Sequence, residues 1–136
     1  MCITYLFYRL SKFKEKTLFI NKEILTVYIA DSFLTQAVGL MYRKSLPKNK
    51  GMLFTTKHDS YYGIWMLNML FKIDIIWIDS NNKVVDIKAN AEPCGSVFHC
   101  KVFKPRKKAK YILEVNADYA KSKNIKIGTI IKIVNV

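Results

Sequence analysis

Short runs of apolar and β-branched residues recur along this chain and are interrupted by turn residues, a pattern typical of a mainly β domain. The clearest case is Ile73 to Ile78, where aliphatic side chains fall on both faces of an extended segment. A polar turn over 79–83 then leads into a second apolar run over 84–89. We expect these two segments to form a β-hairpin whose first strand is covered on both sides.

Other strands are predicted before and after this hairpin. A first hairpin is expected over 17–20 and 24–30, with residues 21–23 as its turn. Further strands are expected just before Asn68 and over 51–55, 97–103, 111–115 and 129–134, with a loop over 57–60. Many short strands at this spacing favour a single-domain β-sandwich or a partly closed barrel.

Two short helices complete the predicted elements. Asp31 or Ser32 is a suitable cap for a helix over 32–41, because the apolar residues that follow have the spacing of one helix face. A second short helix is expected over 118–123. We therefore expect residues 17–136 to form one β-sandwich-like domain and residues 1–16 to be a loosely attached extension.

Composition narrows the class of protein. The 136 residues are 51% hydrophobic and 24% charged, which favours a packed core over disorder. The apolar run from Cys2 to Tyr8 is short and is followed, not preceded, by basic residues. It lacks the form of a secretory signal, and no transmembrane segment is expected. A cytoplasmic location is favoured on this basis, and an extracytoplasmic one stays open.

The net charge of +13 raises the question of an anionic partner. Six basic residues lie within 101–110, and a nucleic-acid site there would use Lys104, Arg106, Lys107 and Lys108. The chain has 20 Lys but only 3 Arg, whereas specific base and phosphate recognition depends on the guanidinium fork. Non-specific nucleic-acid binding is therefore an alternative, and a solvated connection between two strands is the favoured interpretation.

Several short motifs occur in a characteristic order, and together they resemble the uncharacterised domain-of-unknown-function family DUF192 over roughly residues 24–134. The motifs are Gly39-Leu40-Met41 with Arg43, Gly51-Met52-Leu53-Phe54, Trp65-Met66 with Asn68, Ile73-Asp74-Ile75, Tyr111-Ile112-Leu113-Glu114 and Gly128. The resemblance implies a mainly β domain of one unit and implies no activity. The chain departs from the family pattern at Met69 (usually Thr), Lys72 (Pro), Asp118 (Gly) and Thr129 (Asp).

Three charged residues of these motifs, Arg43, Asp74 and Glu114, are candidates for chemistry. A carboxylate in an apolar strand is costly unless it has a partner or keeps its proton. Asp74 and Glu114 would serve a small hydrolase as acid and base, with Arg43 steering an anionic substrate. The favoured interpretation is structural, with Arg43 bound to one carboxylate and tying the helix end to the sheet.

The favoured function is a non-catalytic ligand-binding or interaction module. Three large aromatic residues lie within 61–65, and side chains alternate along a strand, so these rings cannot all face one core. We predict a groove near Trp65 to Asn68 that binds a small molecule, sugar or peptide. Its predicted ligand-binding residues are Arg43, Tyr62, Trp65, Met66 and Asn68.

Sulfur-containing residues do not predict a metal or cofactor site. Several methionines near Trp65 are suitable Cu(I) ligands, but they lie on different elements, so core packing is favoured. If 97–103 is extended, His99 and Cys100 point to opposite faces and cannot bind one zinc ion. A disulfide between Cys94 and Cys100 is an open alternative in an oxidising compartment, whereas free thiols are favoured in the cytosol.

Overall fold

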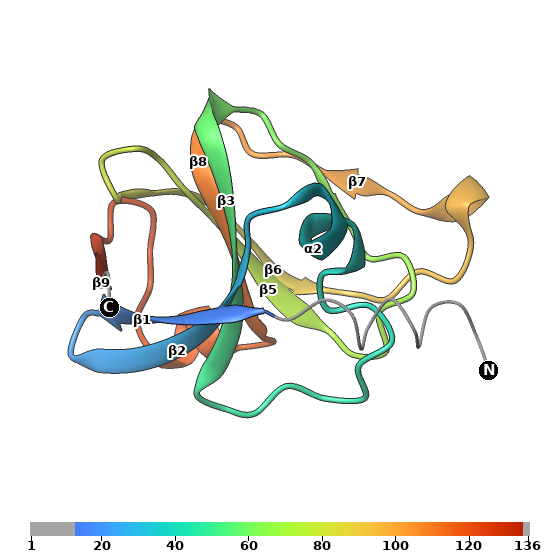
Figure 1. The fold of residues 1–136 in the computed structure, drawn as a ribbon, viewed down its shortest axis with the longest axis horizontal. Coiled ribbons are helices and arrows are strands. Elements are labelled where there is room, and N and C mark those ends of the chain that lie inside the picture. The colour runs from blue at the N-terminus through green and yellow to red at the C-terminus, as the bar shows by residue number, and fades with distance from the viewer. Residues whose placement is uncertain (1–12, 135–136) are drawn as a thin grey trace.

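The computed structural model describes residues 13–134, which form one strongly curled sheet and a small two-stranded ribbon (Figure 1). The strands are β1 (Lys14–Ile20), β2 (Glu23–Ala30), β3 (Lys50–Ser60), β4 (Ile64–Trp65), β5 (Ile73–Ile78), β6 (Val84–Ala91), β7 (Val102–Phe103), β8 (Ala109–Asn116) and β9 (Ile131–Val134). The helices are α2 (Phe33–Val38), the 3-10 turn η1 (Val97–His99) and α3 (Tyr119–Ser122). Among these residues no helix is both long enough and apolar enough to cross a membrane.

The sheet has the order β6-β5-β8-β3-β2-β1-β9, and β4 pairs with β7 in the ribbon. Most neighbours are antiparallel, and the two predicted hairpins, β1–β2 and β5–β6, are confirmed. Their turns hold Asn21 and Asn82 at φ of 53° and 61°, a left-handed conformation that asparagine adopts more readily than most residues. The exception is β2–β3, which is parallel and needs a crossover that includes α2.

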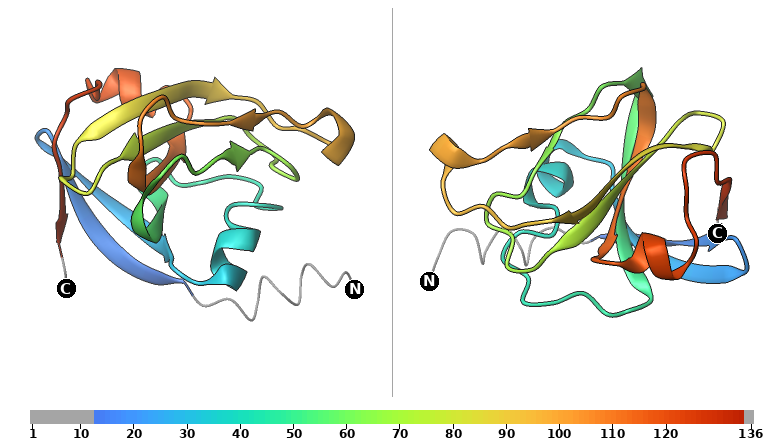
Figure 2. Two further views of the ribbon diagram at one scale, coloured as in Figure 1. Left: turned by 90° about the horizontal axis from the view of Figure 1, so that it is seen from above. Right: turned by 180° about the vertical axis from the view of Figure 1, so that it is seen from behind.

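The two outer strands of the sheet meet at one end of the molecule. The Val84 backbone N–H donates to the Thr129 carbonyl (2.9 Å), and the Gly128 N–H donates to the Val84 carbonyl (2.8 Å). These bonds join the start of β6 to the segment before β9, so the sheet curls into a half-barrel instead of two stacked layers (Figure 2). The mainly β prediction is confirmed, and of the two predicted architectures the partly closed barrel describes the sheet.

Each face of the sheet is covered by its own hydrophobic cluster, because alternate residues of a strand point to opposite sides. One cluster includes Leu53, Ile76 and Leu113 and continues to α3. The other includes Met52 and Ile75 and contains the buried Leu40, which follows α2. Two side chains of neighbouring strands can therefore contact each other only if they lie on the same face of the sheet.

Some predicted element bounds are wrong. The helix predicted over 32–41 ends at Val38, because Gly39 takes a φ of +49° that breaks the helical ladder. Ser32 is its cap, as predicted, and the helix predicted near 118–123 is present as α3. The loop predicted over 57–60 belongs to β3, where Ser60 pairs with Ala109 after a register shift.

The segment predicted as an extended strand over 97–103 is also different. It begins with η1 and is extended only at β7. At the other end of the domain, β1 begins at Lys14, inside the extension predicted over 1–16. Residues 1–12 of that predicted extension lie outside the described residues.

Candidate functional site

A pocket of about 250 Å³ opens between α2, the ribbon strand β4 and one face of the sheet. The side chain of Gln36 forms part of its wall, and its Nε2 donates to the carbonyls of Ala30 (3.1 Å) and Thr55 (2.9 Å). Those bonds hold α2 against β2 and β3. The other lining residues are apolar apart from Glu114: Ala37, Val38, Gly39, Leu40, Met41, Phe54, Gly63, Ile64, Trp65, Leu67 and Met69.

Glu114 lies on β8, beside Met52 of β3 and Ile75 of β5, and is only 5% exposed. Within residues 13–134 the structure gives its carboxyl group no hydrogen-bond or ion-pair partner. Burial raises the pKa of Glu114 from 4.5 to about 8, because the charged form loses its hydration. The side chain is therefore mostly a neutral carboxylic acid at pH 7, able both to donate and to accept a hydrogen bond.

Asp74 is fully buried and has a different environment. Its Oδ1 accepts backbone N–H groups from Asn90 (2.9 Å) and Asp118 (3.3 Å), and its Oδ2 accepts the N–H of Ala120 (3.0 Å). Backbone donors of this kind stabilise a carboxylate and leave it little capacity for a ligand. Asp74 thereby fastens the end of β6 and the start of α3 to β5.

The structure does not bring Asp74 and Glu114 together. Asp74 is paired with Val115 across the β5–β8 ladder, whereas Glu114 is paired with Ile75. Paired residues share a face and consecutive residues do not, so the two carboxyl groups lie on opposite sides of the sheet. The predicted acid–base pair is therefore absent from this fold.

Arg43 also differs from its predicted position. Its guanidinium carbon lies 4.7 Å from the ring centroid of Tyr28 and 5.6 Å from that of Phe13. These cation–π contacts attach the segment after α2 to β2. The hydrogen bonds that the Asp74 carboxylate accepts come from backbone N–H groups and not from the guanidinium of Arg43.

Of the other residues predicted to bind a ligand, Trp65 lines the pocket and is 42% exposed. Met66 is buried in the core. Tyr62 donates its hydroxyl to the His58 carbonyl (3.0 Å). Asn68 takes a φ of 59°, and its carbonyl accepts the Tyr42 N–H (2.9 Å). The sequence analysis did not predict that residues 37–40 form a wall of the pocket. The one sequence feature that pointed to this segment was Gly39, a glycine inside the predicted helix.

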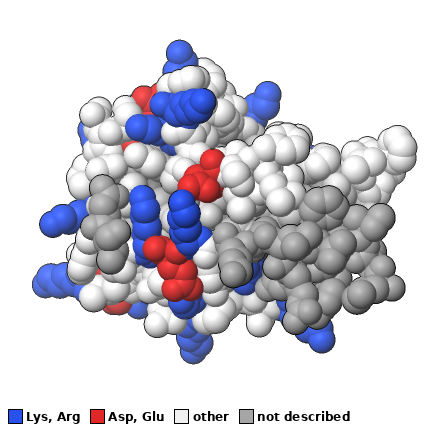
Figure 3. All heavy atoms as spheres, in the orientation of Figure 1, with Lys and Arg blue, Asp and Glu red and all other residues white. Residues whose placement is uncertain are grey.

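The basic segment is organised around one ion pair. Arg106 donates from Nη2 to Oδ1 of Asp86 (3.0 Å), and from Nε (3.3 Å) and its backbone N (2.8 Å) to Oδ2. Burial acts to raise the pKa of Asp86, but the bonds from Arg106 and the neighbouring backbone outweigh it and lower that pKa. Lys104, Lys107 and Lys108 remain exposed. On the face in Figure 3, basic side chains are spread out instead of forming one patch.

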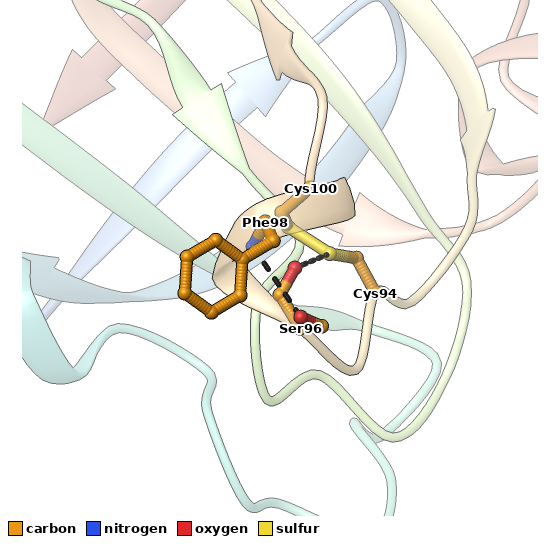
Figure 4. The surroundings of a disulfide bond; sticks show 4 residues. All are labelled: Cys94, Ser96, Phe98 and Cys100. Carbon is orange, nitrogen blue, oxygen red and sulfur yellow. Dashed lines mark hydrogen bonds between the residues drawn. A yellow bond between two sulfur atoms is a disulfide. The ribbon is translucent and has the colours of Figure 1, made fainter.

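Cys94 and Cys100 form a disulfide, with their Cα atoms 5.5 Å apart (Figure 4). The loop that it closes contains η1, whose start is capped by Ser96 through a bond from the Phe98 N–H to Oγ (3.3 Å). His99 lies in this turn and not in a strand, so the predicted alternation of His99 and Cys100 does not apply. Within 13–134 no three His, Cys, Asp or Glu residues are grouped as a metal site.

Comparison with known proteins places these features in a family. The model of DUF192, described as "Uncharacterized ACR", matches residues 16–133 of this chain. The chain belongs to the DUF192 family. The match begins within β1 and ends within β9, and it includes both strands that carry Asp74 and Glu114.

Relatives of this DUF192 chain include archaeal UPF0127 proteins. One from Thermococcus kodakarensis is 30% identical over 105 residues, which are 77% of this chain and 62% of that protein. One from Pyrococcus horikoshii is 36% identical over 95 residues, 65% of this chain and 70% of that protein. The chain thus spans less than two thirds of the length of the Thermococcus relative.

Two solved structures have the same DUF192-type fold. A Sinorhizobium meliloti protein, described as a candidate transcription regulator, has a TM-score of 0.81 and 26% identity, with 90% of this chain and 96% of that chain covered. A protein of unknown function from Novosphingobium aromaticivorans has a TM-score of 0.76 and 25% identity, with 88% and 84% covered.

Two departures from the DUF192 pattern have a structural consequence. Asp118, where the pattern has Gly, takes a φ of 70°, a conformation that glycine adopts without steric cost. Its Oδ1 accepts a bond from Nδ2 of Asn90 (3.2 Å), which a glycine cannot do. Met69, where the pattern has Thr, is buried and lines the pocket.

Proposed function

We propose that this protein is a non-catalytic binding module whose pocket takes a small, mainly apolar group with one hydrogen-bonding end. The observation that carries the proposal is Glu114, a residue only 5% exposed that lines a pocket whose other residues, apart from Gln36, are apolar. A buried polar group without a partner is costly, and a ligand that supplies the partner removes that cost on binding.

The size of the pocket limits the ligand. Its volume of about 250 Å³ is below the range of about 300–1,000 Å³ for sites of drug-sized ligands. The proposed ligand is therefore a fragment-sized molecule or a single side chain of a peptide. Phe54 and Trp65 offer aromatic surface to its apolar part, and Glu114 offers a hydrogen bond to its polar end.

Two other functions have less support. A hydrolase that uses Asp74 and Glu114 would need both carboxyl groups in one cleft, and they lie on opposite faces of the sheet. Nucleic-acid binding through 101–110 would rely on the lysines, because the guanidinium of Arg106 is bonded to Asp86.

The proposal is tested by screening small neutral amides, alcohols and carboxylic acids for thermal stabilisation, followed by NMR mapping of each hit. A ligand that prefers the native state raises its apparent stability. We expect hits to perturb the resonances of Trp65 and Leu67, which line the pocket. Hits that map elsewhere, or a screen without hits, would contradict the proposal.

A matched pair of tryptophan variants separates pocket binding from surface binding. Ala37 is exposed at the pocket wall, so Ala37→Trp is expected to fill the pocket and abolish stabilisation by the hits. Lys121 is exposed on α3, away from the pocket lining, so Lys121→Trp is expected to leave that stabilisation unchanged. Equal responses in both variants would place the binding site outside the pocket.

A further inference from the structure

The ribbon and the disulfide loop together form an arm, defined here as β4, β7 and residues 94–101. Ile64 pairs with Phe103 and Trp65 with Val102, and the disulfide loop lies beyond this pairing. Figures 1 and 2 show the end of the arm projecting away from the seven-stranded sheet. On the face in Figure 3 this projecting end carries neither red nor blue atoms. The arm is thus a protrusion whose end shows no charged side chain on this face.

The end of the arm exposes apolar side chains that the fold does not use. Phe98 is 89% exposed and Val97 is 54% exposed, although both belong to η1. Figure 4 shows the Phe98 ring pointing away from the loop that the disulfide closes. The Cys94–Cys100 bond and the Ser96 cap restrict this turn, so the backbone that carries the exposed side chains is ordered before any partner arrives.

Basic side chains surround the base of the arm. The ammonium nitrogens of Lys88 and Lys101 lie 5.1 Å and 5.4 Å from the ring centroid of Phe103. Lys104 follows and is exposed. The acidic residue in this region, Glu92, is paired with Lys72 at 3.4 Å. An apolar end with a positively charged base complements an anionic lipid surface, in which acyl chains lie beneath the headgroups.

We propose that the arm docks onto an anionic lipid bilayer. Val97 and Phe98 enter the boundary between headgroups and acyl chains, while the lysines at the base face the headgroups. A bilayer fits better than a nucleic acid, because Val97 adds apolar area but no stacking surface. Guanidinium groups for phosphate recognition are also scarce, since the chain has 3 Arg and Arg106 is bonded to Asp86. The proposal does not require a ligand in the pocket, although β4 belongs to the arm and also lines the pocket.

The test uses the full chain, with its disulfide intact, and vesicles of phosphatidylcholine alone or mixed with phosphatidylglycerol. We expect sedimentation with the anionic vesicles and a blue shift of tryptophan emission. The shift reports on the arm, because Trp65 is 42% exposed whereas Trp77 is 1% exposed. Phe98→Ser is expected to weaken partitioning by about tenfold or more, because the variant loses the free energy of burying one Phe side chain in an apolar phase.

Phe33→Ser is the matched control, because Phe33 is 91% exposed but lies on α2. This variant is expected to partition like the unmodified protein. Equal partitioning of the two variants, or binding that high salt abolishes and Phe98→Ser leaves intact, would overturn the proposal. So would an absence of binding to anionic vesicles. Single-stranded DNA is tested in parallel, and DNA binding that depends on Phe98 without vesicle binding would assign the arm to nucleic acid instead.

Discussion

Replacing Glu114 by glutamine removes a titrating group from the pocket while nearly preserving its shape. In the folded protein burial raises the pKa of Glu114 from 4.5 to about 8. Between these two pH values the folded chain keeps the proton and the unfolded chain releases it. Because the unfolded state then binds fewer protons, the free energy of unfolding falls as pH rises. The loss begins near pH 4.5 and is complete above about pH 8.

The magnitude follows from the same pKa difference. Each pH unit in this window lowers the free energy of unfolding by about 1.4 kcal/mol. Glu114→Gln does not titrate, so the variant should match the unmodified protein near pH 4.5 and exceed it at higher pH. The expected advantage is roughly 3 kcal/mol at pH 7 and roughly 5 kcal/mol above pH 8. Because Glu114 is only 5% exposed, solvent screening is a small correction.

Urea denaturation of both proteins between pH 5 and pH 9 measures this difference, and titrations common to both proteins cancel. Glu92→Gln is the control, because the Glu92 side chain is 73% exposed and forms only a surface pair with Lys72. Its stability curve should run parallel to that of the unmodified protein, within about 0.5 kcal/mol. If the Glu114→Gln curve also runs parallel, Glu114 ionises normally in the folded state and the proposed neutral carboxyl in the pocket is refuted.

Three further predictions concern the groups that hold the fold together. Asp74→Asn should lower the free energy of unfolding by about 3 kcal/mol in urea denaturation, because an amide NH₂ then faces backbone N–H donors; an unchanged midpoint would contradict this. Arg106→Met should raise the pKa of Asp86 in a carboxyl NMR titration, so that less stability is lost as pH falls through that pKa; an unmoved titration would show that the ion pair does not hold the carboxylate. Asp118→Ala should be less stable than Asp118→Gly by about 1 kcal/mol, because φ at this position is 70°; thermal unfolding in the reverse order would show that the backbone is not strained.

The parts of the fold that the sequence predicts are those fixed by local pattern. The β5–β6 hairpin follows from an apolar strand, a polar turn and a second apolar strand, and Asn82 supplies the left-handed turn residue. The cap at Ser32 is equally local, because its side chain bonds to Thr35 in the first turn of α2. Interactions within a few residues are sufficient in each case.

The wrong bounds have causes other than the local pattern of apolar and polar residues. The polar end of β3 resembles a loop, yet it stays extended because Thr56 donates to the Lys110 carbonyl (2.6 Å) on a distant strand. Val97 to Cys100 resembles a strand in its side-chain pattern. It instead forms η1, because the disulfide to Cys94 brings the chain ends together around the Ser96 cap. Neither constraint is visible in the periodicity of the segment.

The candidate site shows the same limit more sharply. Asp74 and Glu114 are similar in sequence, since each is a single carboxylate in an apolar β-strand. Their difference depends on the β5–β8 register, which pairs Ile75 with Glu114 and leaves Asp74 on the other face. On that face α3 supplies a backbone donor to Asp74, whereas on the opposite face α2 and β4 enclose a pocket around Glu114. A shift of one residue in that register would move each of these two side chains to the other face of the sheet, so Asp74 would lose its structural role and Glu114 its proposed binding role. The role of each carboxyl group is therefore a property of strand pairing, and the pH dependence of Glu114→Gln tests that pairing as directly as it tests the site.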